Sequence, residues 1–255
     1  MDDELGRILA FSHVIEDGSA TTLTPFRYGT AVFNSDFPHS WMNNFLRVDR
    51  ARPNVQAAAL AEEADRLHGE AGHSHRAIVI EEEETGTRLR AGLEERGYKT
   101  ERNVIMVHRR PPDRIAETSV VEEVDFPRLR PMLEEYYRAE PYGDDEEVVR
   151  QLVERGRLTE AVVNVRHFGV SADGRVVSSS DLYTAGRTAQ VEDVTTLEPY
   201  RGRGYARATV TRALEEARGD LVFLYADEDD WPKELYRKLG FERLALTYLF
   251  TRSGP

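Results

Sequence analysis

The 255-residue sequence contains no cysteine. This absence excludes disulfide bonds, thiolate nucleophiles and cysteine-based zinc or iron–sulfur sites. Long hydrophobic runs are also missing, because no stretch approaches the roughly 18 uninterrupted apolar residues of a transmembrane helix. The first residues, Met1 to Glu4, lack the basic segment and the apolar run of a secretory signal. We therefore expect a soluble, cytoplasmic protein without a membrane partner.

Basic residues are too few to balance the acidic ones. The chain has 34 Lys and Arg residues against 46 Asp and Glu residues, which gives a formal net charge of −12. Affinity for nucleic acid comes mainly from basic side chains that displace counterions, so a nucleic-acid partner is not expected. Long-range attraction favours cationic partners, such as amines. With 40% hydrophobic residues, a chain of this length suits two domains.

The two halves of the sequence are similar to each other. In each half, an apolar run of strand length is followed by a helical pattern that ends in glycine, then by an aromatic residue and a second β-rich run. A shift of 143 residues carries Gly97 to Gly240, and the same shift carries Arg109 to Arg252. The shared order and spacing predict a tandem of two related units.

Two consecutive prolines mark the joint between these units. Pro111 and Pro112 continue neither a strand nor a helix, so we predict domains at 1–112 and 113–255. The second domain is expected to have an α/β (α+β) fold with a mixed, mostly antiparallel sheet flanked by helices. Strands are predicted at 119–123, 160–168, 175–185, 189–197 and 221–226, helices at 127–138, 145–155 and 202–218, and a short helix and two final strands at the end.

The first domain has only the later part of this plan, with a strand at 41–49, a helix at 54–67 and a strand at 76–81. The turn before this helix contains no glycine, whereas the corresponding turn of the second domain reads Arg201-Gly-Arg-Gly-Tyr-Ala206. Glycines let a diphosphate approach the backbone, and the positive end of a helix attracts anions. If phosphate binds, we expect it in the second domain.

Taken alone, the turn does not distinguish a phosphate site from an ordinary surface turn. A Walker A loop is excluded, because its Gly-Lys-Ser/Thr ending is absent. A dinucleotide-binding loop needs a third glycine where Arg207 stands, although Asp227 lies at roughly the spacing of a ribose-binding acid. Arg201, Gly204 and Ala206 instead match the Arg/Gln-x-x-Gly-x-Gly/Ala signature of the GCN5-related N-acetyltransferases.

The chain resembles this superfamily (GNAT) over more than the turn. Three motifs follow in the family's usual order and spacing: Val194-Thr-Thr-Leu197, Pro199-Tyr-Arg-Gly-Arg-Gly204 and Leu235-Tyr-Arg-Lys-Leu-Gly-Phe241. The resemblance is strong over 189–243 and looser over 114–255, and the first domain is similar to a degenerate copy without the cofactor loop. Two positions depart from the pattern, since Asp229 stands where the family often has asparagine and the proline of the turn lies one place late.

The resemblance implies that the second domain binds acetyl-CoA and uses no metal. The strand before the turn would pair its backbone with the pantetheine arm at Val194, Thr195, Thr196 and Leu197. Within that stretch, the N–H of Leu197 would donate to the thioester oxygen and stabilise the oxyanion. The turn would hold the diphosphate through Arg201, Gly202, Arg203, Gly204, Tyr205 and Ala206, and Asp229 would add a further cofactor contact.

The resemblance also suggests which groups move protons. Tyr236 falls at the family's general-acid position, and simple packing on an amphipathic helix is the alternative. An amine nucleophile needs a base, and Glu192 and Asp193 lie on the strand beside the cofactor. Strand alternation points these two side chains to opposite faces, so Glu192 is chosen if the strand is regular, and a bulge would exchange the two.

The implied reaction is transfer of an acetyl group to a primary amine of a small molecule or peptide, by direct attack in a ternary complex. The alternatives are a non-catalytic acetyl-CoA sensor or interaction protein on the same scaffold, and a nucleotide-dependent oxidoreductase. Acceptor contacts are expected from both domains, with Tyr28, Phe33 and Trp41 as candidates. The acceptor itself and the oligomeric state, a homodimer included, stay open.

Three histidines, His68, His73 and His75, lie near Glu70 in the sequence, a combination that could suggest a metal. The segment 69–74 is typical of a loop between a helix and a strand, where histidines are exposed. We therefore expect exposed histidines and no metal site.

Overall fold

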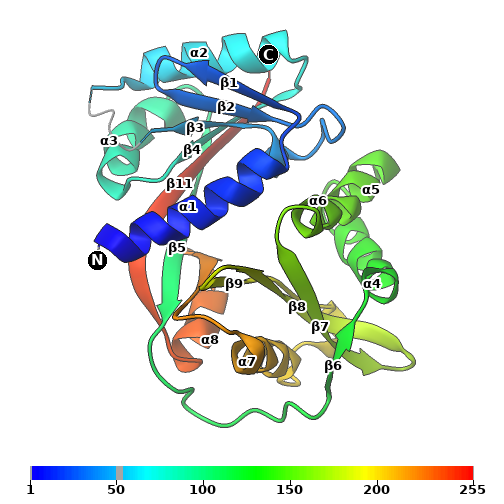
Figure 1. The fold of residues 1–255 in the computed structure, drawn as a ribbon. Coiled ribbons are helices and arrows are strands. Elements are labelled where there is room, and N and C mark those ends of the chain that lie inside the picture. Colours follow the sequence, from blue (N-terminus) through cyan, green and yellow to red (C-terminus); the bar gives the residue numbers. More distant parts are fainter. Residues whose placement is uncertain (1, 50–53, 255) are drawn as a thin grey trace.

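The structure is a computed structural model that describes residues 2–49 and 54–254 (Figure 1). The elements of the first half are α1 (Asp2–Gly18), β1 (Thr22–Phe26), β2 (Gly29–Phe33), the 3-10 helix η1 (Trp41–Asn43), β3 (Phe45–Val48), α2 (Ala57–Glu70), β4 (His75–Ile80), α3 (Glu83–Glu94) and β5 (Lys99–His108). Those of the second half are β6 (Val121–Val124), α4 (Phe126–Arg138), α5 (Glu146–Glu154), α6 (Gly156–Glu160), β7 (Asn164–Ala172), β8 (Arg175–Ala185), β9 (Thr188–Thr196), the 3-10 helix η2 (Glu198–Tyr200), α7 (Tyr205–Glu216), β10 (Leu221–Asp227), α8 (Pro232–Lys238) and β11 (Phe241–Ser253).

The described strands form one sheet of 11 strands in the order β1-β2-β3-β4-β11-β5-β10-β9-β8-β7-β6. Two neighbouring pairs are parallel, β3 with β4 and β9 with β10, and the other pairs are antiparallel. The mixed, mostly antiparallel sheet with flanking helices confirms the predicted fold class. The order β3-α2-β4-α3-β5 in the first half matches β9-α7-β10-α8-β11 in the second half.

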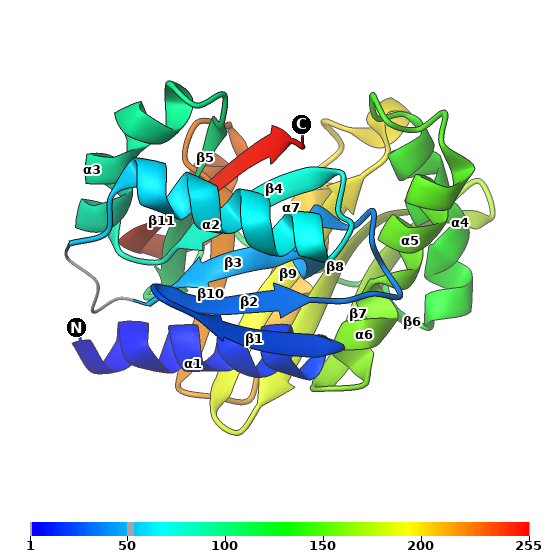
Figure 2. The ribbon, with the colours of Figure 1, turned by 90° about the horizontal axis from the view of Figure 1, so that it is seen from above.

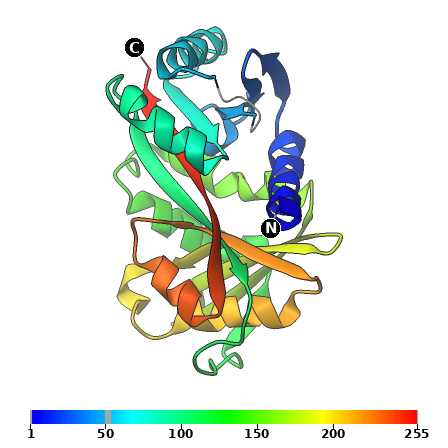
Figure 3. The ribbon, with the colours of Figure 1, turned by 90° about the vertical axis from the view of Figure 1, so that its left-hand side faces the viewer.

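The two halves exchange their last strands. Strand β5 of the first half pairs with β10 and β11, and strand β11 of the second half pairs with β4 and β5. Figure 3 shows the long red strand β11 running from one half of the molecule into the other. The predicted boundary at residue 112 lies in the connection between β5 and β6. The division into domains 1–112 and 113–255 stays a prediction.

The hydrophobic core lies on both faces of the sheet. Along β5, Val104 and Met106 face the cluster that α2, α3, α7 and α8 cover, whereas Ile105 and Val107 face α1. Figure 2 shows α4, α5 and α6 grouped at the end of the molecule opposite α3. In the part of the chain that the structure describes, no helix has the length and apolar character needed to cross a membrane.

Several element boundaries differ from the predicted ones. The predicted strand at 41–49 begins as the 3-10 helix η1, and the strand predicted at 160–168 begins only at Asn164, because α6 occupies 156–160. The two strands predicted at the end of the sequence form a single strand, β11. The register of β11 with β5 shifts between Arg243 and Ala245. This irregularity interrupts the alternation and makes a single strand look like two in the sequence.

Candidate active site

Strands β9 and β10 separate midway along their length. Their parallel pairing covers residues 188–190 of β9 and ends opposite Phe223 of β10. Both strands continue beyond that point, β9 to Thr196 and β10 to Asp227, while the other edge of β9 stays paired with β8. Among the described strands, none pairs with this edge of β9 beyond residue 190. Its backbone N–H and C=O groups are therefore open to a ligand.

A β-bulge lies in this open stretch. The pairing of β9 with β8 shifts by one residue, so that Asp193 and Val194 lie opposite Ser180 alone. Asp193 has a positive φ of 49°, a conformation that residues other than glycine rarely adopt. Because the bulge breaks the alternation, Glu192 and Asp193 both line the same two cavities. We expected Glu192 at the site for a regular strand and Asp193 in its place for a bulged one; the bulge is present, and it brings both carboxylates to the cavities.

The two carboxylates have different surroundings. Asp193 accepts a hydrogen bond from the hydroxyl of Tyr183 at 3.0 Å, and a guanidinium nitrogen of Arg155 lies 3.6 Å from its other oxygen. Glu192 accepts a hydrogen bond from the amide of Gln190 and forms no ion pair within the described residues. Burial, together with the negative charge of Asp193, raises the pKa of Glu192 above its ordinary value. Glu192 is therefore suited to accept a proton near neutral pH.

Arg155 and Tyr183 were missed by the sequence analysis, because neither belongs to a motif. Tyr183 lies on β8 directly opposite Gln190 of β9, across a two-residue hairpin turn. Since a short turn fixes the register of a hairpin, the sequence held a signal that could have placed Tyr183 near the site. Arg155 follows α5 and reaches the bulge only through the tertiary fold.

Tyr236 lies on α8 and contacts both the core and the site. Its side chain is 7% exposed, and its ring packs edge-on against Phe241 with the centroids 6.2 Å apart. It also lines the cavity that contains Glu192 and Asp193. Its hydroxyl has no hydrogen-bond partner in the described part of the chain, and burial raises its pKa. The position is compatible with both predicted roles, packing and proton donation.

The glycine turn leads into α7. Gly202 and Gly204 have φ angles of 77° and 84°, which favour glycine, and a Cβ atom at either position would meet nothing within 4 Å. The first hydrogen bond of the helix runs from the N–H of Ala208 to the carbonyl of Gly204. The N–H groups of Tyr205 and Ala206, in the first turn, have no partner within the helix. The turn therefore offers main-chain donors and a positive helix end to an anion.

The arginines of this segment divide into two kinds. Arg201 and Arg203 are exposed, and each donates to a carbonyl oxygen of the preceding residues at 3.2 Å. Arg207 is buried and pairs with Asp113 at 2.7 Å. A buried arginine where a dinucleotide-binding loop needs glycine argues against that alternative.

The N–H of Leu197 does not face the open edge. It donates to the carbonyl oxygen of Val177, on β8, at 3.0 Å. The prediction that the N–H of Leu197 donates to the thioester oxygen is therefore wrong. Backbone groups alternate in direction along a strand, and those of Val194 and Thr196 therefore point away from β8. The carbonyl of Thr196 agrees, because it accepts a hydrogen bond from Arg201 outside the sheet.

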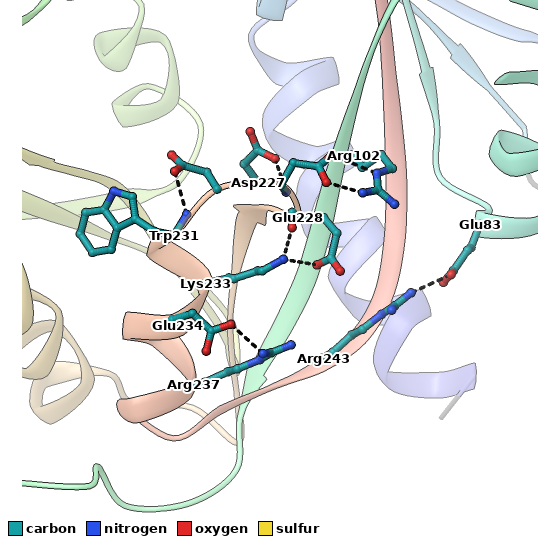
Figure 4. A network of polar contacts seen from close by, with 11 residues as sticks. Glu83, Arg102, Asp227, Glu228, Trp231, Lys233, Glu234, Arg237 and Arg243 are labelled. Carbon is teal, nitrogen blue, oxygen red and sulfur yellow. Dashed lines mark hydrogen bonds and ion pairs between the residues drawn. The ribbon is translucent and has the colours of Figure 1, made fainter. Parts of the chain in front are cut away.

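Asp229 lies in the acidic run between β10 and α8, of which Figure 4 labels Asp227 and Glu228. The guanidinium of Arg102, on β5, binds both of its carboxylate oxygens and lowers its pKa. Glu228, in the same run, has a carboxylate oxygen 3.7 Å from Nζ of Lys233 on α8. Asp229 lines neither cavity at the bulge. It connects the end of β10 to β5, and its cofactor contact stays a prediction.

Two cavities meet at the bulge. The first, of about 320 Å³, lies beside β9 and has Tyr236 in its wall; the second, of about 360 Å³, lies between the two halves. Both are lined by Arg155, Glu192, Asp193 and Tyr225. Of the three side chains predicted to touch an acceptor, Trp41 lines the second cavity, whereas Tyr28 and Phe33 line neither and pack in the core of the first half.

The three histidines are buried, so the prediction that they are exposed is wrong. His68 and His75 are fully buried, and burial lowers the pKa of His68 to about 3 and that of His75 to about 4. Ring nitrogens of His68, His73 and His75 lie within 4.8 Å of one another, and Nδ1 of His68 is 3.1 Å from Nδ1 of His73. Glu70 instead pairs with Arg66 on the surface. The rings pack as neutral core side chains against Phe33 and Trp41, and the expectation of no metal stays a prediction.

Residues 127–241 match the model of the family described as "Acetyltransferase (GNAT) family". The matched segment includes the open edge of β9, the bulge, the glycine turn and Tyr236. This segment of the chain is therefore similar to the GNAT superfamily.

A curated relative, the N-alpha-acetyltransferase RimI of Mycobacterium tuberculosis, is 34% identical over 91 residues, which cover 34% of this chain and 58% of the relative. The chain thus spans less than two thirds of that relative.

Solved structures extend the similarity of fold to both halves. A conserved protein of unknown function from Staphylococcus epidermidis has a TM-score of 0.69 at 12% identity and covers 92% of this chain and 95% of its own. A tandem GNAT protein from the clavulanic acid biosynthesis pathway has a TM-score of 0.56 at 17% identity, over 82% and 75% of the two chains. A GCN5-related N-acetyltransferase from Kribbella flavida has a TM-score of 0.56 at 16% identity, over 98% and 95%. These similarities show the fold over both halves of the chain.

Proposed function

We propose that the chain is an N-acetyltransferase that moves an acetyl group from acetyl-CoA to a primary amine of a small molecule or peptide, in a ternary complex. The GNAT family of residues 127–241 supports acetyl transfer in general, and the relative from M. tuberculosis is named as an N-alpha-acetyltransferase. The observation that carries the proposal is the open edge of β9 next to the glycine turn. A cytoplasmic location is part of the same proposal.

The cofactor uses main-chain groups for most of its contacts. Its diphosphate lies against the backbone of 202–206, with Arg201 and Arg203 at the rim. Its pantetheine arm follows the edge of β9 that β10 leaves unpaired. The N–H of Val194 or of Thr196, rather than that of Leu197, donates to the thioester oxygen as negative charge develops on it.

Two side chains move the protons. Glu192 accepts a proton from the amine, and the free amine attacks the thioester carbonyl carbon. The carbon–sulfur bond breaks, and the thiolate takes a proton from the hydroxyl of Tyr236; complete transfer is optional, because a thiol has a pKa of about 8.5. The acylated nitrogen gives up its second proton as it becomes an amide, and this proton restores the tyrosine hydroxyl or leaves to water. Asp193, next to Arg155, makes Glu192 more basic through its negative charge.

The first half covers the acceptor side of the site. Helix α1, η1 and β4 of the first half contribute walls to the cavity between the halves, together with β11 of the second half. The proposal assigns no cofactor to this half, because the turn before α2 has no glycine; residues 50–53 of that turn lie outside the described residues. The first half is then a degenerate copy that shapes the acceptor cleft.

The proposal is tested by thermal shift against acetyl-CoA, longer acyl-CoAs and NAD(P), followed by a panel of amines assayed for release of free CoA. At 100 times its dissociation constant, acetyl-CoA should stabilise the protein by about 2.7 kcal/mol. A shift with acetyl-CoA but no CoA release with any amine would favour the alternative, a sensor or interaction protein. A shift with NAD(P) alone would overturn the cofactor assignment.

A further inference from the structure

The cavity between the halves has more carboxylates than cations. Its lining, among the described residues, includes one cationic side chain, Arg155, and five acidic ones, Glu16, Glu81, Glu192, Asp193 and Asp227. Three of the five already have charged or protonatable partners. Glu16 pairs with Arg47 at 2.6 Å, Glu81 lies 2.6 Å from a ring nitrogen of His13, and Asp193 is near Arg155. The other two, Glu192 and Asp227, form no ion pair within the described part of the chain.

Asp227 is the one member of its acidic run that lines the cavity. Arg102 is bound to Asp229, and Lys233 to Glu228, so the nearby cations are engaged elsewhere (Figure 4). The contact that Asp227 makes is with the backbone N–H of Asp229, at 2.7 Å. A negative charge is therefore left at this end of the cavity.

The two unpaired carboxylates are separated along the cavity. Tyr225 borders both cavities at the bulge, and Asp227 lies two residues further along β10, which corresponds to about 7 Å. The wall of the same cavity carries apolar side chains, namely Ile15, Trp41, Met42, Phe45, Val79 and Leu249. Trp41 and Met42 are 38% and 55% exposed, so this apolar wall reaches the surface. The arrangement suits an apolar chain with a positive charge at each end.

We infer that the acceptor is an alkyl diamine, with the reacting amine at Glu192, the second amine, protonated, beside Asp227, and the methylene chain against the apolar wall. This inference rests on the proposed function, because it names the acceptor class of the same site. A protonated amine pairs favourably with a carboxylate that has no other cation, and the methylene groups gain from burial. A peptide acceptor without a basic side chain near its terminal amine would leave Asp227 without a partner.

The test compares two acceptors that differ in the second amine alone, 1,5-diaminopentane and pentylamine, by release of free CoA from acetyl-CoA. We expect kcat/KM for the diamine to exceed that for pentylamine by up to about fivefold, the scale of one charge pair at an exposed carboxylate. In Asp227→Asn the preference is lost, because KM rises for the diamine and not for pentylamine. Asp230→Asn is the matched control, since it removes the same charge from the same run outside the cavity.

The outcomes separate this inference from the proposed function. A preference for the diamine that Asp227→Asn abolishes and Asp230→Asn retains supports the inference. Equal use of the two amines by the unmodified protein, or an equal loss in both variants, overturns the inference and leaves acetyl transfer intact. Stabilisation by acetyl-CoA without CoA release from any amine overturns the proposed function, and the acceptor inference with it.

Discussion

The strand pairs β3–β4 and β9–β10 occupy corresponding places in the two halves, and each has a helix between its parallel strands. Strands β3 and β4 stay paired to their last residues, Val48 and Ile80. The pairing of β9 and β10 stops at Gln190 and Phe223, well before either strand ends. The same architecture thus has a closed form and an open form. A ligand can pair with the strand backbone only where the two strands separate, that is, between β9 and β10. The separated pair is also the one whose first strand is followed by a glycine turn.

The two halves of the chain complete each other's part of the sheet. One of the two neighbours of β10 in the sheet is β5, which belongs to the first half. One of the two neighbours of β4 is β11, which belongs to the second half. Neither half therefore has a complete sheet without the other. This explains how a half without a glycine turn before its helix remains part of the structure around the candidate site.

The largest effect is expected from glycine substitutions that compare the two halves. Gly204→Glu places a carboxylate where the diphosphate is proposed to lie, and should abolish thermal stabilisation by acetyl-CoA. Gly97→Glu in the first half is the matched control, because both glycines have a positive φ and open space around them. The control should lose similar intrinsic stability and keep the acetyl-CoA shift. A normal shift in Gly204→Glu would contradict the placement of the cofactor.

Glu192→Gln should lower kcat by about 10²–10⁴-fold, the usual contribution of a general base. In the unmodified protein, kcat/KM should rise with pH as Glu192 loses its proton, with a midpoint above the ordinary glutamate pKa of about 4.3. Asp193→Asn removes the negative charge that raises this pKa, so its midpoint should move to lower pH. Rate measurements from pH 5 to 9 (roughly the stable range) on the unmodified protein and the two variants check the loss of kcat and the two midpoints. A profile that neither substitution changes would rule out Glu192 as the base.

Phe250→Ala tests the shared sheet. Phe250 is fully buried on β11, and its loss should lower the free energy of unfolding by about 3–5 kcal/mol. Because the chain has two tryptophans, Trp41 in the first half and Trp231 in the second, single-tryptophan variants report each half separately. Denaturant titrations should show both probes shifting together. A shift confined to one probe would mean that the halves unfold independently.

Tyr236→Phe is expected to have the smallest effect, a loss of about tenfold in kcat. Stability should change by less than about 0.5 kcal/mol, since the hydroxyl has no hydrogen-bond partner among the described residues. Steady-state kinetics and denaturation of the same sample separate the two quantities. An unchanged kcat would leave Tyr236 with packing alone.

Local patterns predicted much of the second half, including α7, the glycine turn and the strands around it. The bulge was not predictable, because it depends on a positive φ at Asp193 and on its partner Ser180 across the hairpin. The burial of His68 and His75 depends on packing against Phe33 and Trp41, which are distant in sequence. The exchange of β5 and β11 likewise joins segments more than a hundred residues apart, beyond the reach of local periodicity.

A crystal structure with acetyl-CoA tests the central claim most directly. The account predicts one cofactor per chain, with its diphosphate on the backbone of 202–206 and its pantetheine arm hydrogen-bonded to β9 in the gap beside β10. The corresponding site between β3 and β4 should be empty. A cofactor bound in the first half, or a gap beside β9 that the soaked ligand does not enter, would contradict the account.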